Sequence, residues 1–333
     1  MVQEAIVDEV RELLAARNRD GLADLAARLN PFDWADVVPH LSPEEVAILI
    51  QWLPDERVPD LLAELDPAAA AAILRTLSRN QAAAVLEAMD PDDAADVVEE
   101  LPDAEAQQIL IEMAPEEAAE LRELLAYPAE TAGGLMTPAF VAISPDLRAD
   151  QAIAALRHVA EQAETLYYVY VIDEAEHLLG VLSLYKLVLT QPDTVVRELM
   201  VTNAIRVRAD ADQEEAARLL TDHNLLALPV VDEENRLLGI ITQDDIADVL
   251  QEEATEDIER LGGSQPLDVP YRLATIPLLF RRRIVWLLAL FVAEAYTGTV
   301  MRAFEDELAR VVALSFFVPL LIGTGGNVGS QVT

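Results

Sequence analysis

The chain has 333 residues, of which 52% are hydrophobic, so it is long enough for two or three domains that each have a core. It contains no cysteine and only four histidines, which excludes disulfides and thiolate metal sites and argues against a zinc enzyme. The formal charge of −37 should repel nucleic acid and attract cations, although adaptation to salt would explain the same excess of acids.

Residues 1–130 carry a twelve-residue repeat and no secretion signal. A leucine or methionine recurs at Leu29, Leu41, Leu53, Leu65, Leu77, Met89, Leu101 and Met113. At most steps Pro, Asp or Ser follows within two residues, as in Ser42-Pro43, which is typical of a helix start. Such short helices cannot bury their apolar faces alone, so we expect an all-α superhelical repeat domain. A plain helical bundle is the alternative.

From residue 131 the pattern changes to alternating and β-branched runs, such as residues 166–172, between helical stretches. This region is duplicated, because Val171-Ile172-Asp173 matches Val230-Val231-Asp232 and residues 180–183 match residues 239–242. We therefore expect two similar α/β halves, at 131–195 and 196–250. The strand that ends in Asp, and the Gly-hydrophobic-hydrophobic-Ser/Thr turn before a helix, resemble a tandem CBS-domain pair.

A polar helix is predicted from Asp245 to Leu261, so residues 251–280 should form a connecting (plug) helix and a linker. Three arginines then precede an apolar run at 284–300, and a second apolar run lies at 311–322. The positive-inside rule places residues 1–280 in the cytoplasm. Residues 281–333 predict the first two transmembrane segments of an incomplete pore, because two spans form at best a helical hairpin.

The order of these parts, and the segment Gly325-Gly326-Asn327 in its glycine-rich setting, resemble the MgtE magnesium channels. Residues 130–138 and 253–258 are also similar to that family. The resemblance implies a multi-domain fold in a homodimeric channel of the bacterial inner (plasma) membrane, selective for Mg²⁺ and closed by the cytosolic Mg²⁺ that it conducts. We expect no enzyme, because no nucleophile–base pair, phosphate loop or metal-hydrolase signature occurs.

A Mg²⁺ sensor needs opposed acidic faces, because Mg²⁺ keeps most of its waters and binds one or two carboxylates at each site. Asp92 and Asp96 share one side of a repeat helix, and Asp245 begins the connecting helix. The resemblance implies that the repeat-domain acids face the CBS pair. The expected Mg²⁺ ligands, at several regulatory sites, are Asp60, Asp92, Asp96, Glu214, Asp245, Asp248, Glu253, Glu256 and Asp257. For Asp60 and Glu214, a solvated helix face is the alternative.

Facing carboxylates supply a physical basis for gating. Two like charges about 4 Å apart repel by about 4 kcal/mol at an effective dielectric constant near 20. A bound divalent cation reverses that sign. Several weak sites together can provide the roughly 5.5 kcal/mol that moves a two-state gate from mostly open to mostly closed.

Gly325, Gly326 and Asn327 are predicted to line the pore, where backbone carbonyls and an amide oxygen would face a hydrated ion. A helix-breaking turn is the alternative. Glu294 lies inside the first apolar run, where it either serves the pore or pairs with a further helix.

Thr242-x-x-Asp245 resembles the turn that holds a nucleotide ribose in many CBS domains, so ATP is a second candidate ligand. The first half has Ser183-x-x-Lys186 and lacks the acid. The rival function is therefore a membrane-anchored CBS adenine-nucleotide sensor without transport activity. The chain also has Asn224 where the family often places an acid, which would weaken that metal position.

Overall fold

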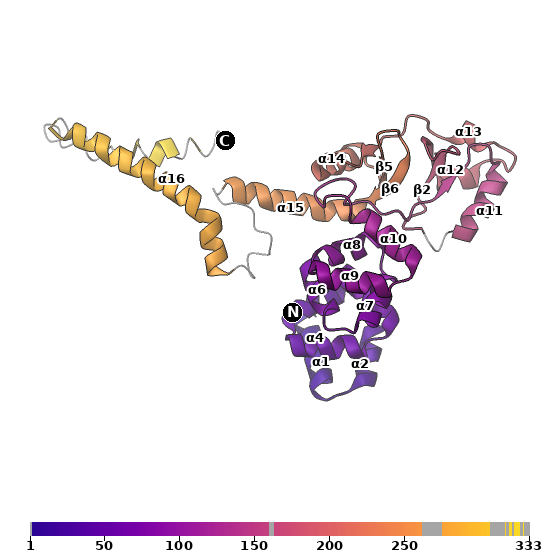
Figure 1. The fold of residues 1–333 in the computed structure, drawn as a ribbon, viewed down its shortest axis with the longest axis horizontal. Coiled ribbons are helices and arrows are strands. Elements are labelled where there is room, and N and C mark those ends of the chain that lie inside the picture. Colours follow the sequence, from indigo (N-terminus) through magenta and orange to yellow (C-terminus); the bar gives the residue numbers. More distant parts are fainter. Residues whose placement is uncertain are drawn as a thin grey trace. The chain divides into compact units, whose positions relative to one another are not determined.

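The computed structural model describes residues 2–159, 163–261, 275–306, 317, 320–321, 323–326 and 329. The chain forms two compact units, Met1–Leu250 and Gln251–Thr333. The first unit contains a stack of short helices and two small sheets, and the second contains long helical segments (Figure 1).

Short helices build the N-terminal part. They are α1 Val2–Ala15, α2 Arg19–Ala26, α3 Pro31–Val37, η1 Val38–His40, α4 Pro43–Trp52, η2 Asp55–Arg57, α5 Val58–Ala63, α6 Pro67–Leu74, α7 Arg79–Leu86, α8 Pro91–Glu99, α9 Asp103–Glu112 and α10 Pro115–Leu124. Helices two positions apart pack together, as in α6 with α8, α7 with α9 and α8 with α10. Such packing is typical of a repeat array, and the all-α repeat domain is confirmed.

The twelve-residue period corresponds to one helix plus its capped connection. Leu53 and Met113 are the C-cap residues of α4 and α9, and both are buried in the core. At the other end of α4, Ser42 and Glu45 form a reciprocal capping box, and Pro43 occupies the first turn. The repeated apolar residue therefore closes each helix onto the core.

The duplicated region forms two matching three-stranded sheets. Its elements are β1 Ala142–Ile143, α11 Ala149–Val159, β2 Tyr168–Ile172, β3 Leu178–Ser183, α12 Leu184–Leu189, α13 Val196–Leu199, β4 Val207–Arg208, α14 Gln213–His223, β5 Ala227–Val231 and β6 Leu237–Thr242. In each sheet the first strand is parallel to the second, and the second is antiparallel to the third. The register shifts at Val171/Ile172 and at Val230/Val231, so even the irregularity is repeated.

The two halves exchange short entry segments. Thr137, near the start of the first half, pairs with Ile240 on β6, and Val201, near the start of the second half, pairs with Val181 on β3. A Cβ atom on Gly239 would lie 2.8 Å from the Thr137 carbonyl oxygen, and one on Gly180 would lie 2.7 Å from that of Val201. The glycine of each duplicated motif therefore admits the exchanged backbone.

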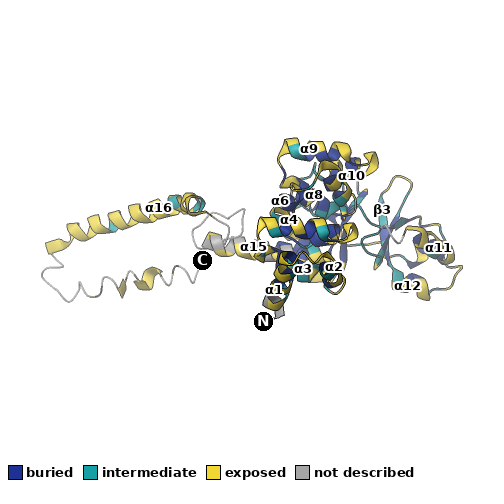
Figure 2. Ribbon diagram, turned by 90° about the horizontal axis from the view of Figure 1, so that it is seen from below, coloured by how far each residue is buried: buried dark blue, intermediate teal, exposed yellow. Residues whose placement is uncertain are grey.

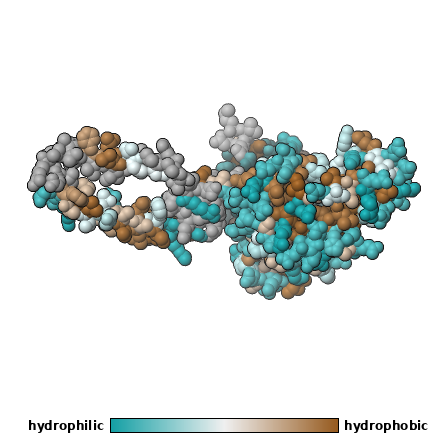
Figure 3. All heavy atoms as spheres, turned by 90° about the horizontal axis from the view of Figure 1, so that it is seen from above, coloured by the Kyte–Doolittle hydropathy of each residue, from teal (hydrophilic) through white to brown (hydrophobic). Residues whose placement is uncertain are grey.

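Two long helices follow. Helix α15 runs over Gln243–Leu261, and α16 runs over Ile276–Ala303. Helix α16 begins eight residues before the predicted apolar run, because arginine is a good helix former and Arg281–Arg283 continue the helix. It is long and apolar enough to cross a membrane, and its apolar side chains are exposed (Figures 2 and 3). The predicted second span, 311–322, lies outside the described residues except at 317 and 320–321.

Candidate cation site

Carboxylates from three parts of the first unit line a cavity of about 480 Å³. They are Asp60 on α5, Glu64 next to it, Asp90, Asp92 and Asp93 at the start of α8, Glu164 before β2, and Asp244 and Asp245 on α15. The other described lining residues are apolar: Pro31, Phe32, Pro59, Ala63, Ala88, Met89 and Ala247. Within the described lining, no basic side chain offsets the negative charge.

The first turn of α8 directs its acids at this cavity. Asp90 is the N-cap residue, yet its side chain makes no capping hydrogen bond. Asp92 and Asp93 lie in the first turn, where the helix dipole favours negative charge. Buried Val97 and Val98 hold the other face of α8 in the core, which fixes the direction of the acidic face.

Thr242 orients the two carboxylates at the start of α15. Its side chain is buried, and its hydroxyl donates to Asp245 Oδ2 over 2.7 Å and also to Asp244 Oδ1. The Thr242 backbone N–H donates to Asp245 Oδ2 over 3.1 Å. The Thr-x-x-Asp motif that resembles a nucleotide turn therefore acts here as a helix cap that holds two acids at the cavity.

Glu164 brings the first of the two α/β halves into the site. Its backbone N–H donates to the Ala139 carbonyl over 2.8 Å, so the segment before β2 is fixed to the entry segment of the same half. Its side chain lines the cavity with the α8 and α15 acids. The sequence analysis did not identify this residue, because nothing in the local pattern at 163–167 marks it.

Burial and mutual repulsion shift the pKa values of these acids upward. Burial is the largest cause for Asp92, whose pKa lies well above its usual range, and Asp245, Asp93 and Glu164 add to the effect. Burial, with the nearby charges of Asp90 and Asp245, raises the pKa of Asp93 to about 8. Burial, followed by Asp90, Asp245 and Asp244, raises the pKa of Glu164 to about 7. The acids therefore interact as one group across three segments.

Two carboxylate oxygens at this site are buried and lack a hydrogen-bond partner within the described residues. They are Asp92 Oδ1 and Glu164 Oε2. Buried polar atoms are almost always paired, so two orphan oxygens in one acidic cavity indicate a missing positive group. An all-carboxylate set suits a hard cation such as Mg²⁺.

The cavity has room for a hydrated cation. Among the described residues, no group of three acidic or histidine side chains is arranged to hold a metal ion directly. Mg²⁺ usually keeps several waters and takes one or two carboxylates, and a cavity of about 480 Å³ leaves room for them.

The structure brings together three of the predicted metal ligands, Asp60, Asp92 and Asp245, in this cavity. Asp96 is exposed one turn further along α8, and its charge helps to raise the pKa of Asp93. Glu214 is exposed on α14 and is absent from the described lining of the cavity. Glu253 is partly exposed on α15.

Other predicted residues are only partly described. The side chains of Asp248, Glu256 and Asp257, and the whole of Asn327, lie outside the described residues. Gly325 and Gly326 are helical and exposed, and the pore assignment stays a prediction.

The sequence analysis missed five lining acids: Glu64, Asp90, Asp93, Glu164 and Asp244. Two of them were detectable, because Asp93 and Asp244 each adjoin a predicted ligand in an Asp-Asp pair.

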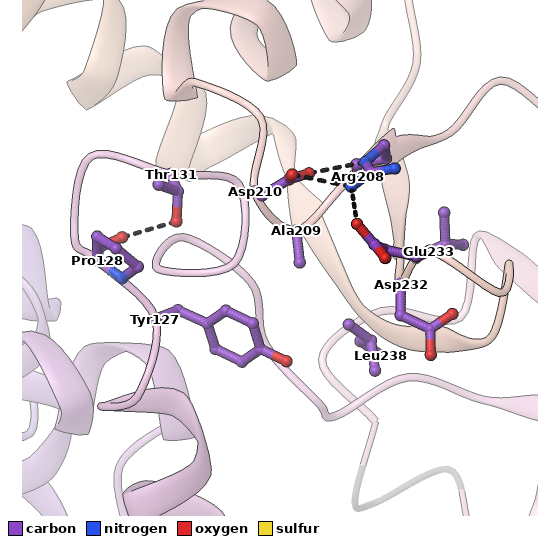
Figure 4. Close-up of a pocket in the computed structure, with 10 residues that line it drawn as sticks. Tyr127, Pro128, Thr131, Arg208, Ala209, Asp210, Asp232, Glu233 and Leu238 are labelled. Atoms are coloured by element: carbon purple, nitrogen blue, oxygen red, sulfur yellow. Dashed lines mark hydrogen bonds and ion pairs between the residues drawn. The ribbon is translucent and has the colours of Figure 1, made fainter.

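A second cavity, of about 350 Å³, lies where the linker after α10 meets the second CBS half (Figure 4). Arg208 at its rim donates to Asp210 over 2.8 and 2.9 Å and to Glu233 over 2.9 Å. Its charge is therefore already matched by two acids. A Cβ atom on Gly133 would lie 2.5 Å from the Tyr127 ring, so the linker packs tightly here. This cavity is therefore part of the packed junction between the linker and the second half, and it offers no unpaired charge from Arg208 to a ligand.

Two family models match the chain. The "MgtE intracellular N domain" matches residues 29–130, and the "CBS domain" matches residues 132–191 and 196–252. The magnesium transporter MgtE of Thermus thermophilus is 46% identical over 213 residues, which cover 64% of this chain and 47% of the relative. That of Bacillus subtilis is 42% identical over 208 residues, which cover 62% and 46%. The chain thus spans about half the length of the curated relatives that it matches.

Two solved structures cover most of the chain. The cytosolic domain of the Mg²⁺ channel MgtE in complex with ATP has 36% identity and a TM-score of 0.70, and the match covers 73% of this chain and 99% of that one. The soluble part of a magnesium transporter has 32% identity and a TM-score of 0.68, and the match covers 76% and 99%.

Proposed function

We propose, because this chain belongs to the MgtE family of magnesium transporters, that its residues 1–250 bind Mg²⁺ in the acidic cavity and thereby control a Mg²⁺ pathway through the membrane. The observation that carries this proposal is Asp92 Oδ1, which is buried and has no hydrogen-bond partner within the described residues, in a cavity whose described lining is acidic and apolar.

Without a cation, α8 and the start of α15 present like charges to each other. Burial weakens screening, so this repulsion opposes the packing of the repeat domain on the CBS pair. A hydrated Mg²⁺ between Asp92 and Asp245 turns repulsion into attraction and favours the closed arrangement of these parts. Asp60 and Asp90 lie at the same cavity and add to its negative potential.

The membrane part of the function follows from family membership and α16. We propose that α16 is a transmembrane helix of a homodimeric Mg²⁺ channel in the bacterial inner membrane, with residues 1–280 on the cytoplasmic side. The pore would take in Gly325, Gly326 and Asn327, and Mg²⁺ is then both the transported ion and the regulator. The relatives are named as transporters, which agrees with the expectation of no enzymatic activity.

Titration of the full chain in detergent with MgCl₂, followed by calorimetry and thermal unfolding, tests Mg²⁺ binding. We expect saturable binding and a rise in melting temperature that NaCl of matched ionic strength does not reproduce. Asp92→Asn should weaken binding about tenfold or more, whereas the exposed Asp222→Asn should leave it unchanged. Equal responses of the native chain to Mg²⁺ and to matched NaCl would contradict the proposal.

ATP is a second proposed ligand, because one of the similar structures is a complex with ATP. The Thr242–Asp245 turn is a poor place for it in this chain, since a triphosphate there would face the acids of the cavity. Calorimetry with ATP tests this directly. Saturable ATP binding by a chain that ignores Mg²⁺ would favour the rival function, a membrane-anchored CBS nucleotide sensor.

A further inference from the structure

Glu164 is the one described lining acid of the cation cavity that comes from the first CBS half. It lies at a junction, because it also lines a cavity of about 640 Å³ that runs past Asp90 and Glu120. It borders a third cavity, also of about 640 Å³, lined by Tyr167 and Tyr185 of the same half. The side chain therefore stands where the repeat domain, the first half and the start of α15 meet.

The contacts of Glu164 are not those of a structural ion pair. Buried structural carboxylates are normally paired with a base or bound by several donors. Within the described residues, Glu164 Oε2 is buried and has no hydrogen-bond partner, and the described lining of the three cavities that it borders contains no Lys, Arg or His. After burial, the causes that raise the pKa of Glu164 are the charges of the acids Asp90, Asp245 and Asp244.

Asp92 provides an independent second observation. Its Oδ1 is likewise buried without a partner within the described residues, and its charge interacts with both Glu164 and Asp245. Two orphan oxygens from different segments thus border the same space, and a third acid is held there by Thr242. A positively charged partner is what these two oxygens lack within the described residues.

We propose that Glu164 contributes its carboxylate to the Mg²⁺ bound in this cavity, so that one hydrated ion joins the repeat domain to both CBS halves. This inference rests on the proposed function and deepens it. An ion bound only by residues of α8 and α15 would make no contact with the first CBS half. With Glu164 as a ligand, through the ion's water or directly, the segment before β2 and the Ala139 entry segment to which it is bonded become ordered by the same ion.

The test compares Glu164→Gln with Glu174→Gln in the full chain in detergent. Glu174 is an exposed acid in the turn after β2, so it controls for the loss of one charge. We expect Glu164→Gln to raise the Mg²⁺ concentration for half-maximal stabilisation about tenfold, and Glu174→Gln to leave it unchanged. Glu164→Asp, which keeps the charge on a shorter side chain, should restore part of the affinity.

A second readout separates ligation from a structural role. Without Mg²⁺, Glu164→Gln should melt at the same temperature as the native chain or higher, because it removes an unpaired buried charge. Mg²⁺ should also slow amide hydrogen exchange of residues 163–167 in the native chain and not in Glu164→Gln. A native-like Mg²⁺ response in Glu164→Gln overturns this inference alone, whereas absence of any Mg²⁺ response in the native chain overturns the proposed function as well.

Discussion

At the scale of one side chain, Asp93 shows how burial and neighbouring negative charges act on an acid of the cavity. It follows Asp92 in the first turn of α8, is partly buried, and has no basic neighbour in the described lining of the cavity. Burial and the charges of Asp90 and Asp245 raise the pKa of Asp93 to about 8, so its carboxyl group is mostly protonated near neutral pH. A cation bound at this cavity would lower the pKa of Asp93 and so favour loss of that proton.

We expect the metal-free chain to lose stability as pH rises toward about 8, since Asp93 binds its proton more tightly when folded than when unfolded. The stabilising contribution is fully present below the unfolded pKa of 3.8 and is lost as pH passes through the folded value. Asp93→Asn should flatten this pH dependence and stabilise the metal-free chain by on the order of 2 kcal/mol above about pH 8. Urea unfolding at a series of pH values, with Asp222→Asn as control, measures both effects. An unchanged pH profile in Asp93→Asn would refute the assignment.

At the scale of one element, the repeat helices are shaped by their ends as much as by their apolar faces. Helix α4 has a capping box and a proline in its first turn, and it ends on buried Leu53. Helix α8 has the same Asp-Pro start that caps α6 at Asp66, yet the side chain of Asp90 makes no cap bond. The start of α8 therefore gives up a stabilising cap at the position where the acids gather.

Ser42→Ala should destabilise the chain by about 1 kcal/mol, because the Glu45 backbone N–H loses its acceptor. Ser42→Asn keeps an acceptor at the N-cap and should retain most of the stability. Thermal unfolding without divalent cations compares the two variants. An unchanged melting temperature in Ser42→Ala would show that the cap contributes nothing to α4.

At the scale of the whole molecule, the chain combines a net charge of −37 with one described candidate span, α16. The first turn of α16 contains no acidic residue, and its first half carries three arginines. The acid excess attracts cations, and α16 is long and apolar enough to cross a membrane.

Helix α16 should insert across a bilayer in a translocon insertion assay. Leu290→Arg places a charge near its centre and should disfavour insertion by about 2.5–3.5 kcal/mol, whereas Leu290→Ile should insert like the native segment. Efficient insertion of Leu290→Arg would contradict the prediction that the apolar side chains at the centre of α16 drive its insertion.

The sequence alone determined the order of parts, because each has its own local period. The twelve-residue repeat, the duplicated strand motif and the apolar run of α16 depend on neighbours within a few residues, and secondary structure is set at that range. Asp92 and Asp245 were likewise predictable, since they lie on recognisable helix starts and the resemblance pointed to them. Helix α16 begins eight residues before the apolar run that the sequence predicted, because the arginines continue the helix.

Only the tertiary structure decided which acids meet. Asp92 and Asp245 lie 153 positions apart in the sequence, and Glu164 lies between them in a segment without a pattern of its own. In a chain with 60 acidic residues, composition cannot separate Glu164 from the exposed Glu214. Burial, the absence of a hydrogen-bond partner and the raised pKa arise from packing between distant segments, and long-range packing leaves no local trace in the sequence.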